Sequence, residues 1–150
     1  MVWWYSINPN RVLSQDIPIM TISIFISADF EGGNIEHIET VPKDENVPFP
    51  IVRLNVRPDP YTSLESIHHM QYFCFKATVE ADVKVRYILA NAGQVSYPEA
   101  WPDTTVCYTN TEDYQKVDDS WRRNLSTRYV GEELIWEHQH SVENPTVYFR

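Results

Sequence analysis

Alternation of apolar and polar residues is the feature that most constrains the fold of this chain. In IVRLNVR, residues 51–57, Val52, Leu54 and Val56 share one parity, whereas two arginines and an asparagine take the other. Successive side chains of a β-strand point to opposite faces of the sheet, so a period of two indicates a strand with one buried face. A chain built from such segments must pair them into sheets that bury their apolar faces.

The same period recurs in further segments, and turn-forming clusters such as VENP (142–145) separate them. Short strands with frequent turns are typical of sandwiches, so the sequence predicts an all-β fold, an antiparallel β-sandwich of roughly eight or nine short strands. The other alternating segments are TISIFIS (21–27), QYFCFKATV (71–79), VKVRYILAN (83–91), ELIWEHQ (133–139) and PTVYFR (145–150).

The first 19 residues show neither the strand period nor the helix period. We therefore expect residues 1–19 to be an irregular leader and residues 20–150 to form one sandwich domain. A chain of 150 residues can bury enough apolar surface for one such domain without further staples.

The formal net charge of −9 argues against two classes of partner. Nucleic-acid binders neutralise phosphates with Lys and Arg, and anionic membrane surfaces attract basic segments. We find no signal-peptide pattern and no apolar run of the roughly 20 residues that a membrane span needs. The sequence therefore predicts a cytoplasmic protein without nucleic-acid or membrane partners, in which Cys74 and Cys107 are reduced thiols.

Residues Gly32, Gly33 and Asn34 follow the segment 21–27 and raise the question of a phosphate-binding loop. Such a loop is followed by a helix, and its Walker form also carries a lysine; neither pattern is present here. Glycine adopts positive φ without strain and asparagine with little, so this tripeptide predicts a structural turn. We expect the turn to close a hairpin in which residues 34–41 pair with residues 21–27.

The histidines near the C-terminal end are the candidate metal ligands. His138 and His140 share one face of the predicted strand, and His140 with Glu143 matches the H-x-x-E spacing of a zinc site. A catalytic zinc needs three protein ligands, and a short motif of this kind often arises by chance. We therefore expect no metal or other cofactor to be held by this chain.

Three stretches, in order, carry a resemblance to a known family. They are SADFEGGNIE (27–36), HHMQYFCFKATVEADVKVRYILANAGQVSYPEAW (68–101), and VCYTNTEDYQKV (106–117) followed by ELIWEHQHSVENPTVYFR (133–150). Together they resemble the N-terminal domain of the cytosolic-type zinc carboxypeptidases, which include the tubulin deglutamylases and bacterial relatives. The chain departs from the family pattern at Tyr72, where a tryptophan is usual, and at Gln94, where a lysine is common.

The resemblance implies a non-catalytic accessory domain that packs in cis against a catalytic domain absent from these 150 residues. The parent would be a zinc enzyme that removes C-terminal amino acids, glutamates among them, from polypeptides. In that role Tyr97, Trp101 and Phe149 are the expected interdomain contacts, since large aromatics often anchor interfaces.

Two other functions stay open from the residues alone. The aromatic content, 13% of the chain, is also compatible with a stand-alone sandwich that binds a glycan or a protein, with Trp101 as the stacking residue. The second is an autonomous metalloprotein that uses His138 and His140.

Overall fold

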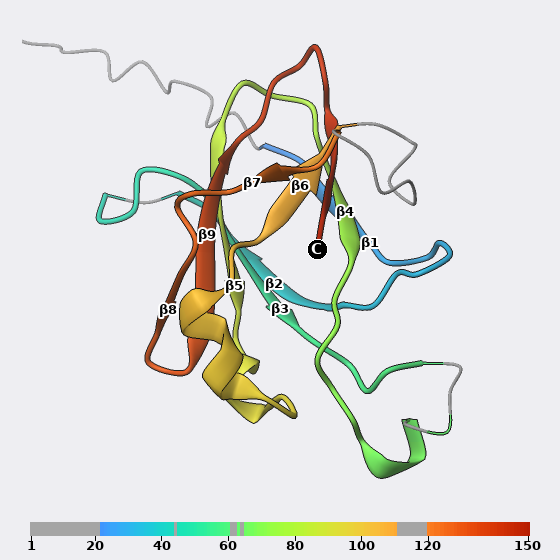
Figure 1. Cartoon of the computed structure of the whole chain (residues 1–150). Coiled ribbons are helices and arrows are strands. Elements are labelled where there is room, and N and C mark those ends of the chain that lie inside the picture. The colour runs from blue at the N-terminus through green and yellow to red at the C-terminus, as the bar shows by residue number, and fades with distance from the viewer. Residues whose placement is uncertain (1–21, 44, 61–62, 64, 111–119) are drawn as a thin grey trace, which may run out of the picture.

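The computed structural model describes residues 22–150 except 44, 61–62, 64 and 111–119, and these residues form two five-stranded sheets packed face to face (Figure 1). The all-β prediction is confirmed, whereas the predicted leader, residues 1–19, lies outside the described residues. The strands are β1 (Ile24–Ser27), β2 (Glu36–Val41), β3 (Ile51–Asn55), β4 (Phe75–Val79), β5 (Lys84–Leu89), β6 (Cys107–Thr109), β7 (Arg122–Arg123), β8 (Arg128–Val130), β9 (Glu133–Gln139) and β10 (Thr146–Phe149). In the described part of the chain three short 3-10 helices accompany them: η1 (Glu65–Ile67), η2 (Ala92–Gln94) and η3 (Pro98–Asp103).

One sheet has the strand order β1-β4-β10-β6-β7 and the other has the order β2-β3-β5-β9-β8. All pairs are antiparallel except β3 and β5, which run parallel. Parallel neighbours need a crossover connection, and here residues 56–83 supply it by crossing to the other sheet and forming β4. The fold is therefore a sandwich with one parallel pair, where the sequence predicted antiparallel pairing throughout.

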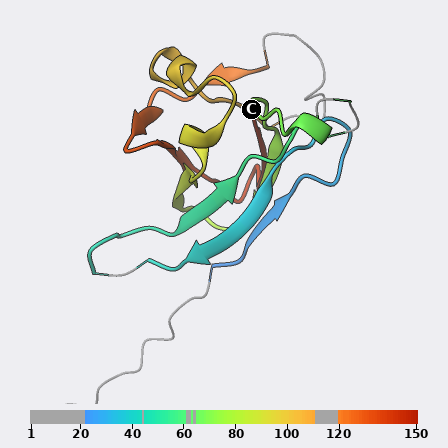
Figure 2. The same cartoon turned by 90° about the horizontal axis from the view of Figure 1, so that it is seen from below.

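The predicted hairpin between residues 21–27 and 34–41 is wrong. Strand β1 pairs with β4 in the first sheet, whereas β2 pairs with β3 in the second, with a bulge between His37 and Glu39. Figure 2 shows β2 and β3 projecting from the sandwich as their own hairpin. Alternation fixes which face of a strand is buried but not which strand lies beside it, so the local order was a poor guide to partners.

The core lies between the sheets and is built from the apolar parity of each strand. Val52, Leu54 and Val56 are buried, as the alternation predicts. Aromatic rings fill the centre: the ring centroids of Tyr87 and Trp136 are 5.5 Å apart, and Phe149 lies 5.0 Å from Tyr87. Close aromatic packing of this kind makes the two sheets one unit.

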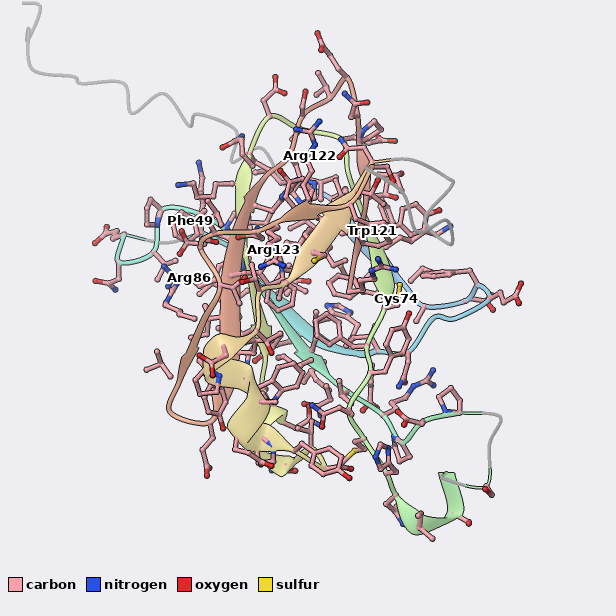
Figure 3. The ribbon with its side chains drawn as sticks, viewed as in Figure 1. Phe49, Cys74, Arg86, Trp121, Arg122 and Arg123 are labelled. Atoms are coloured by element: carbon pink, nitrogen blue, oxygen red, sulfur yellow. The ribbon has the colours of Figure 1, made fainter. Side chains whose placement is uncertain are left out.

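The outer face of the β5–β9 sheet is polar and carries ion pairs. Arg86 contacts Glu137 at 2.8 Å, and Arg53 contacts Glu133 at 2.6 Å. The Arg86 guanidinium also lies 4.9 Å from the ring centroid of Phe49, beside which Figure 3 places it. These paired charges suit a face in contact with water. Within the described residues, no helix has the length and apolar character needed to cross a membrane.

Candidate functional site

The turn at Gly32 and Gly33 connects the two sheets. Gly32 has φ +82°, and the amide of Gly33 donates to the Phe30 carbonyl at 2.9 Å. A Cβ on Gly33 would lie 2.0 Å from the carbonyl oxygen of Ala28, too close for any other residue. Positive φ at the first glycine and close backbone approach at the second explain why this turn carries two glycines.

Asn34 ties this turn to the chain on both sides of the sandwich. Its side chain is 1% exposed, and Nδ2 donates to the backbone carbonyls of Arg57, at 3.0 Å, and of Tyr72, at 2.9 Å. Its backbone also bridges to Cys74. The side-chain oxygen Oδ1 is buried and has no hydrogen-bond partner within the described ranges, which is unusual for a buried polar atom.

A cavity of about 320 Å³ lies beside the turn. Asp59, which lines it, contacts Nδ1 of His69 at 2.6 Å through its carboxylate, and the His69 ring lies 6.1 Å from the ring of Tyr97. The lining residues are Gly32, Gly33, Asn34, Asp59, Pro60 and Tyr72.

We call Asp59, His69, Tyr72 and Tyr97 the tyrosine patch. Tyr72 and Tyr97 are 48% and 55% exposed, so the patch presents two aromatic rings around a histidine–aspartate pair at the surface. Of these four residues, only Tyr97 was expected from the sequence to make interdomain contacts. The other three residues lie in the connection between β3 and β4, and they come together only when that connection folds. The sequence signal for this site was that RPDPYTS (57–63) and HHMQY (68–72), which contain these residues, lie close together in the chain.

The three expected interdomain residues differ in where the structure places them. Trp101 is 4% exposed and its Nε1 donates to the Ala92 carbonyl at 2.8 Å. Phe149 is fully buried, with its ring centroid 5.2 Å from that of Phe75. Of the three, Tyr97 alone presents its ring to solvent, and Trp101 has no exposed face on which a sugar could stack.

His138 and His140 lie side by side, with ring centroids 4.9 Å apart. His140 is buried, and its Nε2 lies 2.8 Å from the hydroxyl of Tyr87. Burial lowers the pKa of His138 to about 4, and burial together with the neighbouring His138 lowers the pKa of His140 to about 3. Both imidazoles are therefore neutral near pH 7.

This pair does not fit a catalytic zinc. Such a site uses three protein ligands, and within the described residues no group of three or more His, Cys, Asp or Glu is placed to hold a metal. Nε2 of His140 already faces Tyr87. Glu143, the other half of the H-x-x-E match, is exposed whereas His140 is buried. No catalytic step follows from these residues.

A second, polar cavity of about 560 Å³ opens beside His138, between β6–β7 and β9. Arg122 is the charged residue among its described lining; Figure 3 labels it together with its neighbour Arg123.

Cys74 and Cys107 are both free thiols, and burial raises the pKa of Cys74. A buried thiol with a raised pKa is a poor nucleophile, so Cys74 is a structural residue.

The family model described as the cytosolic carboxypeptidase N-terminal domain matches residues 26–150. A metallo-carboxypeptidase from Burkholderia cenocepacia has a TM-score of 0.63 at 23% identity, over 85% of this chain and 28% of its own. A metallo-carboxypeptidase from Pseudomonas aeruginosa, solved with (2-guanidinoethylmercapto)succinic acid, has a TM-score of 0.63 at 28% identity, over 83% of this chain and 28% of its own.

A curated relative, an uncharacterized protein of Zymomonas mobilis, is 28% identical over 111 residues, which are 73% of this chain and 26% of that protein. The chain thus spans less than a third of the length of each of these relatives. The Burkholderia likeness shows the fold, and the family model covers most of the chain. By that match the chain belongs to the cytosolic carboxypeptidase N-terminal domain family.

Proposed function

We propose that this chain is a non-catalytic accessory domain that docks in cis against the catalytic domain of a metallocarboxypeptidase. The observation that carries the proposal is the match of residues 26–150 to the N-terminal domain of that family. Relatives of this fold named as metallo-carboxypeptidases are more than three times as long as the matched part, which leaves room for a separate catalytic domain.

The parent enzyme would remove C-terminal amino acids, glutamates among them, from polypeptides in the cytoplasm. The catalytic domain would hold the zinc, because His138 and His140 of this chain do not provide the three ligands that such a site needs. The zinc, its ligands and the groups that recognise the substrate would all belong to the catalytic domain.

The tyrosine patch is the surface best suited to the docking. Its two tyrosines expose large rings with few rotatable bonds, and residues of this kind anchor interfaces at low entropic cost. The outer face of the β5–β9 sheet is a poorer candidate, because Arg86 and Arg53 are already paired with carboxylates there. Covering such pairs would cost desolvation without forming new charge contacts.

A peptidase assay on the purified 150-residue chain tests the non-catalytic role. Peptides that end in glutamate are incubated with the chain and added zinc, and free amino acids are quantified. We expect no release above the buffer control. Release that co-elutes with the 17.6-kDa chain in gel filtration and disappears in a His138→Gln variant would contradict the accessory role and favour the autonomous metalloprotein.

A further inference from the structure

The cavity beside the inter-sheet turn carries an unexplained acceptor. Asn34 lines it, is almost completely buried, and has Oδ1 without a hydrogen-bond partner. The orientation of this amide is fixed, because Nδ2 donates to two backbone carbonyls, those of Arg57 and Tyr72. The oxygen is therefore an acceptor without a donor among the described residues, shielded from bulk water next to the cavity, and leaving it unpaired costs stability.

The rest of the lining favours a positively charged donor. Asp59 contributes a carboxylate, half-buried against His69, and Tyr72 contributes an aromatic ring. Carboxylates and aromatic rings both attract cations, whereas the carboxylate repels an anion. No lysine or arginine side chain lines the cavity among the described residues. The net charge of −9 adds to the attraction.

We propose that this cavity receives a lysine or arginine side chain from a protein partner. The head group donates to the Asp59 carboxylate, and a small displacement of the lining lets it reach the shielded Asn34 Oδ1, while its methylenes lie along Pro60 and Tyr72. A volume of about 320 Å³ accommodates such a side chain with its apolar stem. That the partner is the catalytic domain rests on the proposed function; the recognition of a basic side chain does not.

Binding of small probes to the 150-residue chain tests this recognition. Two-dimensional NMR would follow the backbone amides of Gly32 and Gly33 and the side-chain amide of Asn34 during titration with n-butylammonium. Equal concentrations of n-butanol serve as the neutral probe of the same shape. We expect saturable shifts of these signals with the ammonium and none with the alcohol. Equal shifts with both probes would show a merely apolar hollow and overturn the proposal.

Two variants test whether the negative charge of Asp59 attracts the ammonium probe. Both keep Asn34, whose side chain holds the turn in place. Asp59→Asn keeps the shape of the side chain, and we expect it to weaken n-butylammonium binding about tenfold, the scale of one charged hydrogen bond. Glu143→Gln removes one negative charge from an exposed turn next to β10 and should leave the affinity unchanged. Equal affinity in wild type and Asp59→Asn would contradict the proposal, provided that the spectra show both proteins folded.

Lysine blocked at both its amino and carboxyl termini distinguishes a polypeptide partner from a small amine. If the cavity receives a protein side chain, the blocked lysine shifts the same signals as n-butylammonium with similar or higher affinity. Binding of n-butylammonium with exclusion of the blocked lysine would overturn the protein-partner assignment. These outcomes do not depend on any peptidase activity, so they separate this proposal from the accessory role.

Discussion

The hydroxyl of Tyr87 lies 2.8 Å from Nε2 of His140 in the buried core, and it joins β5 to the residue that follows β9. Burial raises the pKa of Tyr87 well above its usual value, so the hydroxyl keeps its proton. The second imidazole nitrogen, Nδ1, is buried and has no hydrogen-bond partner among the residues that the structure describes. This histidine is a structural residue of the sandwich, and within the described part of the chain its side chain forms its hydrogen bond with Tyr87.

Replacing Tyr87 by phenylalanine should therefore destabilise the fold by more than the loss of one exposed hydroxyl. The variant leaves Nε2 of His140 buried and unpaired, for which we expect a loss of about 1–3 kcal/mol in the free energy of unfolding, measured with urea. Tyr108→Phe is the matched control, because Tyr108 is only partly buried and its change should stay within about 0.5 kcal/mol. Equal effects of the two substitutions would contradict the structural role of the pair.

Acid should weaken the fold through His138 and His140. Their folded pKa values, about 4 and about 3, lie below the value of 6.5 in the unfolded chain. Above pH 6.5 both rings are neutral in the folded and in the unfolded state, so they do not lower the free energy of unfolding. Below pH 6.5 the imidazoles are protonated in the unfolded state but stay neutral in the folded state. The free energy of unfolding therefore falls by up to about 1.4 kcal/mol per pH unit for each histidine, until the pH reaches its folded pKa.

Urea denaturation between pH 7 and pH 4.5 measures this slope. Other groups also titrate on the way to low pH, so the comparison is with His138→Gln, which should lower the slope by about one proton while preserving a polar side chain. The same slope in both proteins would show that His138 does not titrate with the folding equilibrium.

Gly33→Ala should be strongly destabilising, because the added Cβ would lie 2.0 Å from the Ala28 carbonyl oxygen and backbone must move. Overpacking of this kind typically costs about 1–3 kcal/mol, and we expect the upper end. Gly131→Ala is the control: its φ of +58° is strained for alanine, but its Cβ would meet nothing within 4 Å, so about 1 kcal/mol is expected. Thermal unfolding of both variants measures the difference, and a Gly33→Ala protein as stable as Gly131→Ala would show that this contact is not as described.

Tyr97→Ala separates docking from folding. In the isolated chain the exposed ring contributes little, so unfolding should change by no more than about 0.5 kcal/mol. In the parent enzyme proposed above, the same change should loosen the contact between domains by about 2 kcal/mol, seen as faster hydrogen exchange in the tyrosine patch. Leu125→Ala, at a side chain that is 90% exposed, should have neither effect. Unaltered exchange in the Tyr97→Ala enzyme would place the interface elsewhere.

The sequence predicted the faces of the strands better than their partners. Alternation identifies Val52 and Leu54 as buried, because side-chain direction is set by local backbone geometry. The partner of β2 was predicted wrongly, since pairing depends on which apolar faces meet across the whole domain. The parallel pair of β3 and β5 arises from the same non-local choice.

The candidate site was harder to predict for a related reason. The cavity brings together Asn34, Asp59 and Tyr72, which requires the turn, the β3–β4 connection and β4 to be folded. The spacing of these three residues in the sequence does not predict that they come together. Burial was equally hard to predict, because the sequence does not show that the side chains of Trp101 and Phe149 are buried in the sandwich; whether they contact another domain stays a prediction. Tyr97 and Trp101 lie in the same proline-containing loop, SYPEAW, and only the structure shows that the first is exposed and the second buried; the contact of Tyr97 with another domain stays a prediction.

The accessory role is tested most directly on the native protein. Antibodies raised against the 150-residue chain would be used to precipitate the protein from extracts of the cells that produce it, and carboxypeptidase activity in the precipitate would be measured on peptides ending in glutamate. We predict release of C-terminal residues that 1,10-phenanthroline abolishes, from a polypeptide much larger than 17.6 kDa that carries this domain. A precipitate with no carboxypeptidase activity, in which the domain occurs only as a 17.6-kDa chain, would contradict the account.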